Sequence, residues 1–308
     1  ALLLALLLAL LLVHRFALLL GFYERCGEFL QQRSGMNFLV VLMIVLVYKS
    51  WPGRRLLRDK IPFAAYQHWF LSRSLAPNAQ YLLCVGLPVA LVFGLGVMLA
   101  SGIWNILWLL LALVVLGYSI GSNNLIQRVA NQTKWLHGLS RAEPMTQVIV
   151  AQNRYIARTT YGVFQSIYPV LFWFLLMGPA GALAYGLSRT YLKNLERDDP
   201  QRQLVETVMY WMEWLPARLT GFIFALLGNF GRCFEAWIAG LFDTGQSQSH
   251  LLRSLLGLAI AEADYQSVQT LPEFVALAEH DMQSSRDLLE RTLFGWLGLA
   301  AILAIIGW

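Results

Sequence analysis

Two long apolar runs constrain what this chain can fold into. They extend from Tyr81 to Ala100 and from Ile103 to Ile120, joined by Ser101-Gly102. A helix needs about 20 apolar residues to cross the hydrocarbon core of a bilayer. The runs are rich in Leu and Val and show no alternation of polar and apolar residues, so transmembrane strands are not expected. Because a helix satisfies its backbone polar groups inside lipid, the sequence predicts an all-α membrane protein with a helical hairpin here.

The composition and the placement of charge agree with this class. Of the 308 residues 57% are hydrophobic and only 13% are charged, against about 25% charged in soluble domains. The formal net charge is +5, and basic residues gather in segments 49–60 and 123–160. Positive loops of a membrane protein stay in the cytoplasm, so both segments are expected there. The basic balance therefore predicts a polytopic protein whose partner is the lipid bilayer, and no nucleic acid is expected.

Cysteine and histidine usage gives no sign of a metal or cofactor. The three cysteines, Cys26, Cys84 and Cys233, form no CxxC pair, and the five histidines are scattered along the chain. Neither a disulfide framework nor a zinc site follows from such spacing. We expect no cofactor, and a homo-oligomer is left open.

Residues 1–35 form a separate segment in the predicted organisation. They begin with a repeated Ala-Leu-Leu-Leu pattern and are expected to form an extra apolar helix outside the core. Residues 36–308 are predicted to form a single membrane domain. Within it, the charged stretch 229–290 is expected to be a helical subdomain on the cytoplasmic side, and Leu293 to Trp308 the last membrane helix.

The segment after the second basic stretch has two interpretations. Tyr161 to Met177 is apolar and would make about 25 Å of helix, slightly short of a span. Gly178-Pro179 then breaks the pattern, and Arg189 and Lys193 follow. A straight span would place these positive residues outside the cell, whereas a re-entrant hairpin would return them to the cytoplasm. The hairpin is the preferred prediction, and the straight span stays open.

Arg218 is the charge that most suggests binding chemistry. It follows Pro216, a residue suited to the first turn of a helix, and an apolar stretch continues to Leu227. A guanidinium at a helix start can hold a phosphate or carboxylate with two hydrogen bonds. Arg189 and Arg158 are expected to contribute to the same cytoplasmic patch. The alternative is structural, with Arg218 paired to Glu213 or to a carbonyl of the hairpin.

Three motifs, taken in order, resemble one membrane protein family. They lie at Val170 to Trp173, Gly178 to Tyr185, and Leu215 to Thr220. This family includes the amide synthases of cobalamin biosynthesis (CobD/CbiB) and the β-lactamase-regulon proteins of the AmpE type. The resemblance is strongest from Tyr161 to Gly257 and does not include residues 1–35.

Several positions depart from the synthase pattern. Tyr161-Gly162 and Gln165 stand where the synthases carry Glu-Asn and Asp, and Arg189 to Leu192 replaces an Asn-Thr-Leu-Asp sequence. Met209 and Tyr210 stand where the synthases carry paired aspartates. Forming an amide with ATP needs acidic residues for Mg²⁺ and for proton transfer. Losing several of them argues against this activity, so we do not expect an enzyme.

The AmpE pattern is closer to this sequence. It is matched by Glu213 to Leu219 and by Leu241 to Thr244. The resemblance implies a modulator of β-lactamase induction and cell-wall sensing in the bacterial inner membrane. We expect such a modulator to bind a small anionic ligand at a cytoplasmic cleft whose residues are Arg218, Thr220, Glu213, Arg189, Arg158 and Asp243. The alternatives are a cobalamin-pathway amide synthase and a transporter of cell-wall fragments, although the two long apolar runs have almost no polar residues to line a path.

Overall fold

The computed structural model describes residues 34–50, 61–71, 76–99, 105–120, 125–139, 144–265, 268 and 270–306. The regular elements of this part of the chain are helices: α2 (Ser34–Ser50), α3 (Ile61–Leu71), α4 (Pro77–Met98), α5 (Asn105–Ser119), α6 (Leu125–His137), α7 (Met145–Asn194), α8 (Arg202–Leu227), α9 (Phe230–Gly240), α10 (Gln248–Ala259) and α11 (Leu271–Ile306). The all-α prediction is confirmed. The extra helix expected within residues 1–35 lies almost entirely outside the described residues.

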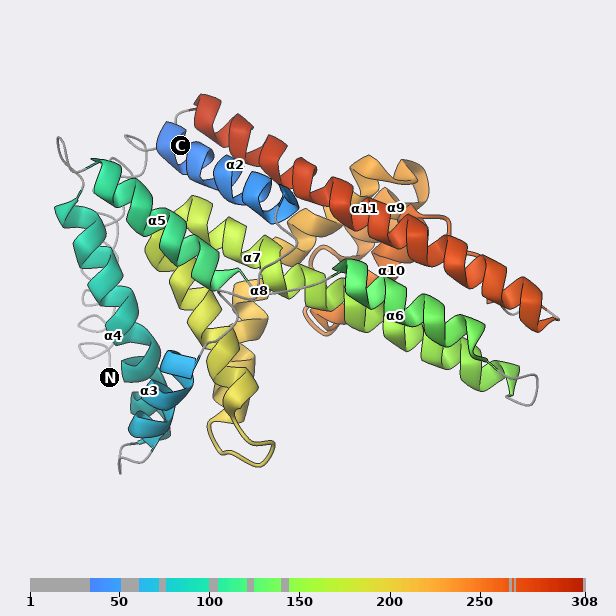
Figure 1. Cartoon of the computed structure of the whole chain (residues 1–308), viewed down its shortest axis with the longest axis horizontal. Helices are drawn as coiled ribbons and strands as arrows, with labels where there is room; N and C mark the ends of the chain where they lie inside the picture. The colour runs from blue at the N-terminus through green and yellow to red at the C-terminus, as the bar shows by residue number, and fades with distance from the viewer. Residues whose placement is uncertain are drawn as a thin grey trace, which may run out of the picture.

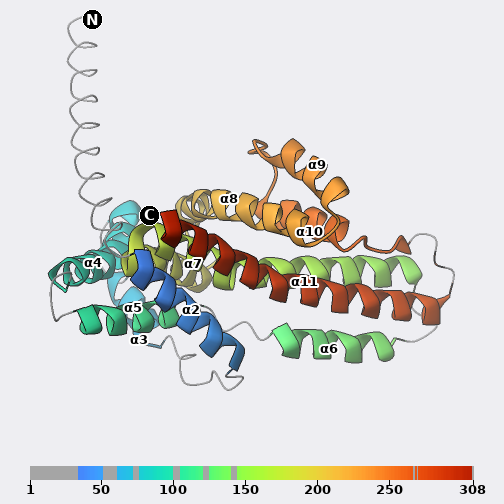
Figure 2. The same ribbon diagram turned by 90° about the horizontal axis from the view of Figure 1, so that it is seen from above.

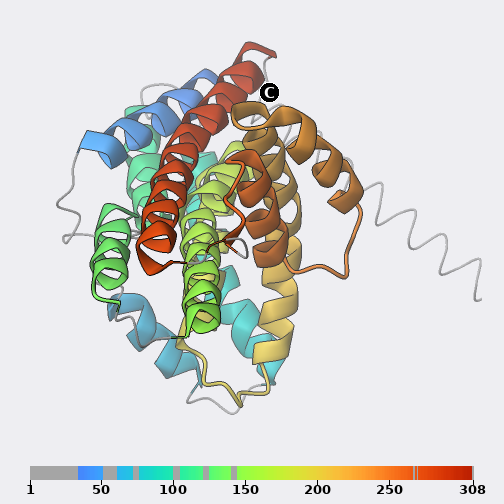
Figure 3. The ribbon, with the colours of Figure 1, turned by 90° about the vertical axis from the view of Figure 1, so that its right-hand side faces the viewer.

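Helix α7 is the centre of the packing. It contacts α2, α3, α4, α5, α6, α8, α10 and α11. At one end of the molecule α2, α4 and α5 surround its C-terminal half, and at the other end α6 and the start of α11 run beside its N-terminal part (Figure 1). The end-on view shows α6, α7, α10 and α11 lying side by side (Figure 3). The molecule therefore has a helix-rich end and a narrower helical arm.

Three of the described helices are long and apolar enough to cross a membrane. They are the segments Asn78–Met98, Met145–Asn194 and Leu271–Ile306, and two shorter apolar helices cover Gly35–Leu46 and Asn105–Ser119. The predicted span within 81–100 corresponds to α4. The one predicted within 103–120 corresponds to α5, which is among the shorter apolar helices, so that it crosses the membrane stays a prediction. Outward-facing Leu and Ile side chains on both helices are consistent with contact to lipid. The apolar helices gather at the helix-rich end (Figure 1).

Gly178 breaks α7 as the sequence predicted. Its φ of 67° and ψ of −154° are non-helical, and the chain continues as a second helical arm. This backbone conformation is open to glycine and costly for other residues. The chain turns sharply here, and the second arm leads away from the line of the first (Figure 1). Whether the turn lies inside the bilayer, as the re-entrant hairpin requires, stays a prediction.

Helices α7 and α11 are longer than a bilayer is thick. The part of α7 before Gly178 and the whole of α11 correspond to about 50 and 54 Å of helix, whereas the hydrocarbon core measures about 30 Å. Leu293 is not the start of the last helix, because α11 already begins at Leu271; the predicted last membrane segment is the apolar C-terminal part of α11. Its polar first half packs on α6 and α7, and a small apolar core that includes Leu136, Val148 and Phe274 holds this arm together.

The expected helix start at Pro216 is also wrong. Pro216 lies inside α8, which runs without interruption from Arg202 to Leu227. A proline within a helix leaves the carbonyl four residues earlier without its N–H partner. Here that carbonyl belongs to Met212, and the indole Nε1 of Trp173 donates to it at 3.0 Å. The tertiary contact replaces the missing helix bond, so the chain continues as one helix.

Candidate functional site

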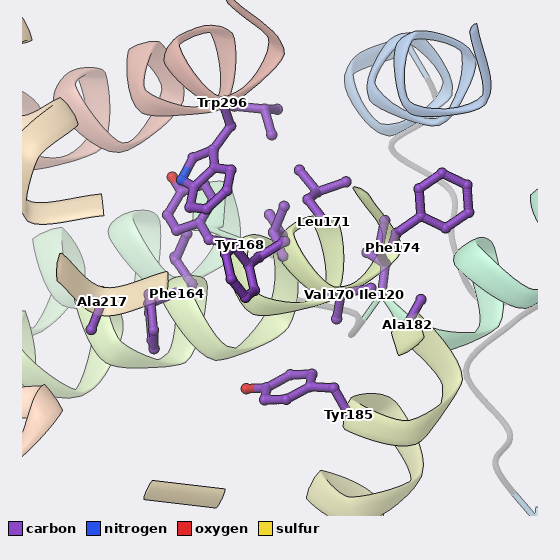
Figure 4. Close-up of a cluster of buried hydrophobic side chains, with 14 of the residues drawn as sticks. Ile120, Phe164, Tyr168, Val170, Leu171, Phe174, Ala182, Tyr185, Ala217 and Trp296 are labelled. Carbon is purple, nitrogen blue, oxygen red and sulfur yellow. The ribbon is translucent and has the colours of Figure 1, made fainter. Parts of the chain in front are cut away.

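Glu213 is the centre of a buried polar network between α7 and α8. Its side chain is almost completely buried. The Tyr161 hydroxyl donates to Oε2 at 2.6 Å, whereas Gln165 Nε2 and the Tyr185 hydroxyl each donate to Oε1 at 2.9 Å. Tyr185 comes from the second arm of α7, and its hydroxyl points back toward the first arm (Figure 4). One carboxylate thus joins α8 to both arms of α7.

Arg189 completes this network through a carbonyl that a proline leaves open. Pro169 has no N–H to offer Gln165 O, the acceptor four residues before it. The Arg189 guanidinium and the Tyr185 hydroxyl both donate to this oxygen, the latter at 3.2 Å. The guanidinium also reaches the carbonyl of Ser119 at 3.5 Å, where α5 ends. A cation is favourable at a helix C-terminus.

Three residues of this network are positions at which the sequence is expected to depart from the synthase pattern. They are Tyr161, Gln165 and Arg189, and the structure brings all three together around Glu213. The departures themselves were therefore the signal that could have located this network. Tyr185 was visible only as part of a motif. Aromatic side chains pack between α7 and α11 next to this network. The rings of Tyr168 and Trp296 are stacked there, with 6.1 Å between their centroids (Figure 4).

Arg218 lies on another side of α8 and has other partners. It is 2% exposed. Its Nε donates to Leu241 O at 3.2 Å and its Nη2 to Asp243 O at 2.7 Å. Its Nη1 donates to Trp214 O at 3.3 Å and to Gln248 Oε1, and the guanidinium lies 4.5 Å from the Trp214 ring centroid.

Four of the five guanidinium N–H donors of Arg218 are thus used internally. Two of the four acceptors, the carbonyls of Leu241 and Asp243, lie in the connection between α9 and α10, so Arg218 fastens this connection to α8. Arg218 follows Glu213 by five positions in the helix, which turns their side chains about 140° apart. The single patch expected around Arg218 is therefore divided over two places.

The remaining predicted site residues do not gather around Arg218. Thr220 is buried and donates to Pro216 O at 2.8 Å within its own helix. Arg158 is exposed on α7. Asp243 contributes its backbone carbonyl to Arg218, and its exposed carboxylate accepts the N–H of Gly245 at 2.9 Å. Of these three, only Asp243 touches the guanidinium.

A polar cleft lies elsewhere, on the arm. It is open to the surface, has a volume of about 450 Å³ and is lined by Ile149, Asn153, His250, Arg253, Ser254, Glu262, Ala263, Asp264 and Tyr265. These residues come from α7, from α10 and from the connection between α10 and α11. The volume falls within the range of about 300–1,000 Å³ that small-molecule pockets occupy.

The wall of the cleft is held by a charge pair. Arg253 donates to both carboxylate oxygens of Glu262, at 2.7 and 2.6 Å, and to Asn153 Oδ1 at 2.8 Å. This two-pronged geometry is the strong form of an ion pair. A Cβ at Gly257 would stand 2.6 Å from Glu262 Oε2, so a side chain there would shift this pair. The wall of the cleft is therefore held by contacts within the protein.

Asp281 fixes the other side of the same connection. Its buried carboxylate accepts the N–H of Ala263 at 3.1 Å and the Tyr265 hydroxyl at 2.6 Å. Burial, together with this hydrogen bond and the charge of Asp281, raises the pKa of Tyr265 well above its usual value, so it remains a donor at physiological pH. The sequence interpretation placed these acidic residues on a solvated surface, because nothing in their spacing shows that the connection folds back onto α10 and α11.

Metal chemistry has no evident ligand set in the part of the chain that the structure describes. There, no three His, Cys, Asp or Glu side chains lie together where they could hold an ion. The acidic groups near Arg253 and Arg218 are instead used in ion pairs and hydrogen bonds within the protein.

Comparison with known proteins assigns the chain to a family. The model of the family described as regulatory signalling modulator protein AmpE matches residues 39–283. Protein AmpE of Shigella flexneri is 30% identical over 117 residues, which are 35% of this chain and 41% of the relative, so the match spans about two-fifths of the relative's length. No solved structure matches the chain significantly. Because the family match includes well over half of the chain, with the Glu213 network, Arg218 and the cleft, this protein belongs to the AmpE family.

Proposed function

We propose that this protein is a signalling modulator of the bacterial inner membrane, linked to β-lactamase induction and the response to antibiotics. The match to a family of regulatory signalling modulators carries this proposal. Several apolar helices would anchor the protein, and the arm built by α6 and the first halves of α7 and α11 would face the cytoplasm. The basic residues in segment 123–160 support this orientation, because positive segments remain on the cytoplasmic side.

The regulatory role can be tested in a bacterium with an inducible β-lactamase. Its resident AmpE gene would be deleted, and this chain or an empty vector supplied instead. We expect β-lactamase activity after exposure to a β-lactam to return to the level of the undeleted strain. Equal activity with this chain and with the empty vector, at verified expression, would remove the regulatory proposal.

The ligand part of the proposal concerns a small molecule with a carboxylate or phosphate group. Such a group at Arg218 would have to displace the carbonyls of Leu241 and Asp243, which already accept from the guanidinium. The cleft on the arm is open, and the hydrogen bonds of Arg253 use three of its five N–H donors. The geometry therefore favours the cleft.

The charged side chains around the cleft indicate what charge a ligand should carry. Glu262 and Asp264 line it together with Arg253 and His250. A purely anionic ligand would meet repulsion from two carboxylates, whereas an ammonium group would be attracted to them. We propose a zwitterionic ligand, with its anionic end toward Arg253 and His250 and an amine toward the acidic residues.

Mass spectrometry of small molecules released from the purified protein tests this placement. Ser254 lines the cleft and is exposed, so Ser254→Trp should fill the cleft and remove the copurified ligand. Arg218→Lys should retain it. The reverse result would assign the ligand to Arg218, and no copurified zwitterion or anion in either the variants or the wild type would overturn the ligand proposal while leaving the regulatory one standing.

A further inference from the structure

Helix α8 has its polar groups inside and its apolar groups outside. Glu213, Arg218 and Thr220 are buried. The outward row begins with the exposed polar residues Gln203, Glu206 and Thr207 and then changes to apolar side chains. This later row consists of Trp211, Leu215, Leu219, Phe222 and Leu226, of which Trp211, Leu215 and Leu226 are 59%, 44% and 55% exposed. Spacings of three and four place these residues on one helix face.

Such an arrangement is the reverse of that on a water-soluble surface helix. There the apolar stripe packs on the core and the charged residues face water. The buried charges of α8 lower its mean hydropathy. For this reason α8 is not among the described helices that are apolar enough to span a membrane. Hydropathy averages over all faces of a helix, whereas the structure separates them.

Neighbouring helices place α8 at the depth of the apolar spans. Trp173, in the apolar first arm of α7, donates to Met212 O at 3.0 Å. Gly295 lies in the apolar half of α11, and a Cβ there would stand 2.5 Å from Ile223 Cγ2. Both helices are long and apolar enough to cross a membrane. The outward row of α8 therefore lies beside apolar parts of α7 and α11, which are candidate membrane spans.

Helix α9 continues the apolar surface beyond the end of α8. Phe222 lies 6.3 Å from the ring of Phe234, which stacks on Phe230 at 4.8 Å. Phe230 is 48% exposed. Viewed from above, α9 stands away from the α7 and α11 bundle (Figure 2). Phe side chains on one face are typical of a helix that lies with its apolar side in the membrane interface.

We propose that the outward face of α8 contacts lipid acyl chains, with the membrane boundary between Thr207 and Trp211. The row from Trp211 to Leu226 covers about 22 Å along the helix, which fits within a hydrocarbon core of about 30 Å. Glu213 and Arg218 then lie at membrane depth. Ionisable groups in that position need partners within the protein, and both have them.

Spin labels on α8 test this placement. In a cysteine-free variant, Leu215→Cys and Leu226→Cys would be labelled and the protein reconstituted in vesicles of phosphatidylcholine and phosphatidylglycerol. Glu206→Cys and Thr207→Cys, exposed on the same helix, are the matched controls. Power-saturation EPR would compare collisions with oxygen, which concentrates in lipid, and with a water-soluble nickel chelate.

We expect the ratio of oxygen to nickel accessibility to be several-fold higher at positions 215 and 226 than at 206 and 207. Equal ratios at all four positions would place the α8 face in water and overturn the proposal. Low accessibility to both reagents at 215 and 226, with spin–spin broadening, would show that a second copy of the chain covers this face, which would also overturn it. Gel filtration of each labelled variant verifies that it remains folded.

Discussion

At the scale of single residues, buried charges hold this protein together. Glu213 accepts three hydrogen bonds and Arg218 donates four, and both are almost fully buried. A charged group loses its hydrogen bonds to water when it is buried. In both residues, hydrogen bonds within the protein take their place. Removing such a side chain costs more free energy than its hydrogen bonds contribute, because the groups that were bonded to it stay buried without a partner.

Glu213→Ala is expected to lower the free energy of unfolding by about 3 kcal/mol, since it leaves buried donors of Tyr161, Gln165 and Tyr185 without their acceptor. Unfolding in mixed detergent micelles measures the change. Glu206→Ala is the control on the same helix: its ion pair with Arg202 is largely exposed, and such pairs contribute about 0–1 kcal/mol. Equal losses in the two variants would contradict the prediction.

Arg218→Lys should loosen the connection between α9 and α10. The ammonium group of lysine cannot donate hydrogen bonds in the same directions as the planar guanidinium. The carbonyls of Leu241 and Asp243 therefore lose their donors. We expect faster amide hydrogen exchange confined to residues 241–248. Arg232→Lys, at an exposed position of α9, should leave exchange in this segment unchanged. Unaltered exchange in the Arg218 variant would mean that the guanidinium does not anchor the connection.

At the scale of elements, prolines and one glycine decide how the helices run. Pro216 and Pro169 do not end their helices, because side chains from elsewhere donate to the carbonyls they leave open. Gly178 does redirect its helix, since its backbone leaves the helical region. Proline and glycine both predict a helix break in a sequence. Here the two prolines continue their helices because tertiary contacts satisfy the open carbonyls, whereas the glycine interrupts its helix.

Gly178→Ala tests the turn in α7. A Cβ there would meet no atom within 4 Å, so the cost is purely that of the backbone conformation, about 1–3 kcal/mol. Gly94→Ala is the matched control, because Gly94 is helical within α4 and also has space for a methyl group. The thermal unfolding midpoint in detergent should fall for Gly178→Ala alone. Equal midpoints for both variants would refute a constrained turn.

At the scale of the whole molecule, two helices extend well beyond any bilayer. The first arm of α7 and all of α11 continue into a helical arm with its own small core. The arm carries the cleft, so continuous helices join the apolar end of the molecule to the cleft.

The side of the membrane on which the arm lies can be found by cysteine labelling. In a cysteine-free variant, Arg154→Cys places an exposed thiol on the arm, and Ser101→Cys places one in the expected tip of the first hairpin. A membrane-impermeant maleimide should label position 101 in cells with a permeable outer membrane, and position 154 only after the inner membrane is opened. Labelling of position 154 without opening the inner membrane would contradict a cytoplasmic arm.

Much of the fold could be predicted from the sequence, because long apolar runs leave few alternatives to helices. The apolar helices α4 and α5 and the break at Gly178 could be predicted from the local sequence. The extent of α8 and α11 was not. Pro216 continues its helix only because Trp173 comes close, and the polar first half of α11 is helical because it packs on α6 and α7.

The site shows the same division. The sequence by itself determined the family, through the motifs around Trp173, Tyr185 and Arg218, and it marked Tyr161, Gln165 and Arg189 as unusual. Only the tertiary structure decided that Arg218 and Glu213 have separate partners and that a cleft forms elsewhere. The physical reason is that hydrogen bonds to backbone carbonyls depend on where chain segments meet. Carbonyls are present at every residue, so the sequence does not show which of them a buried charge will bind.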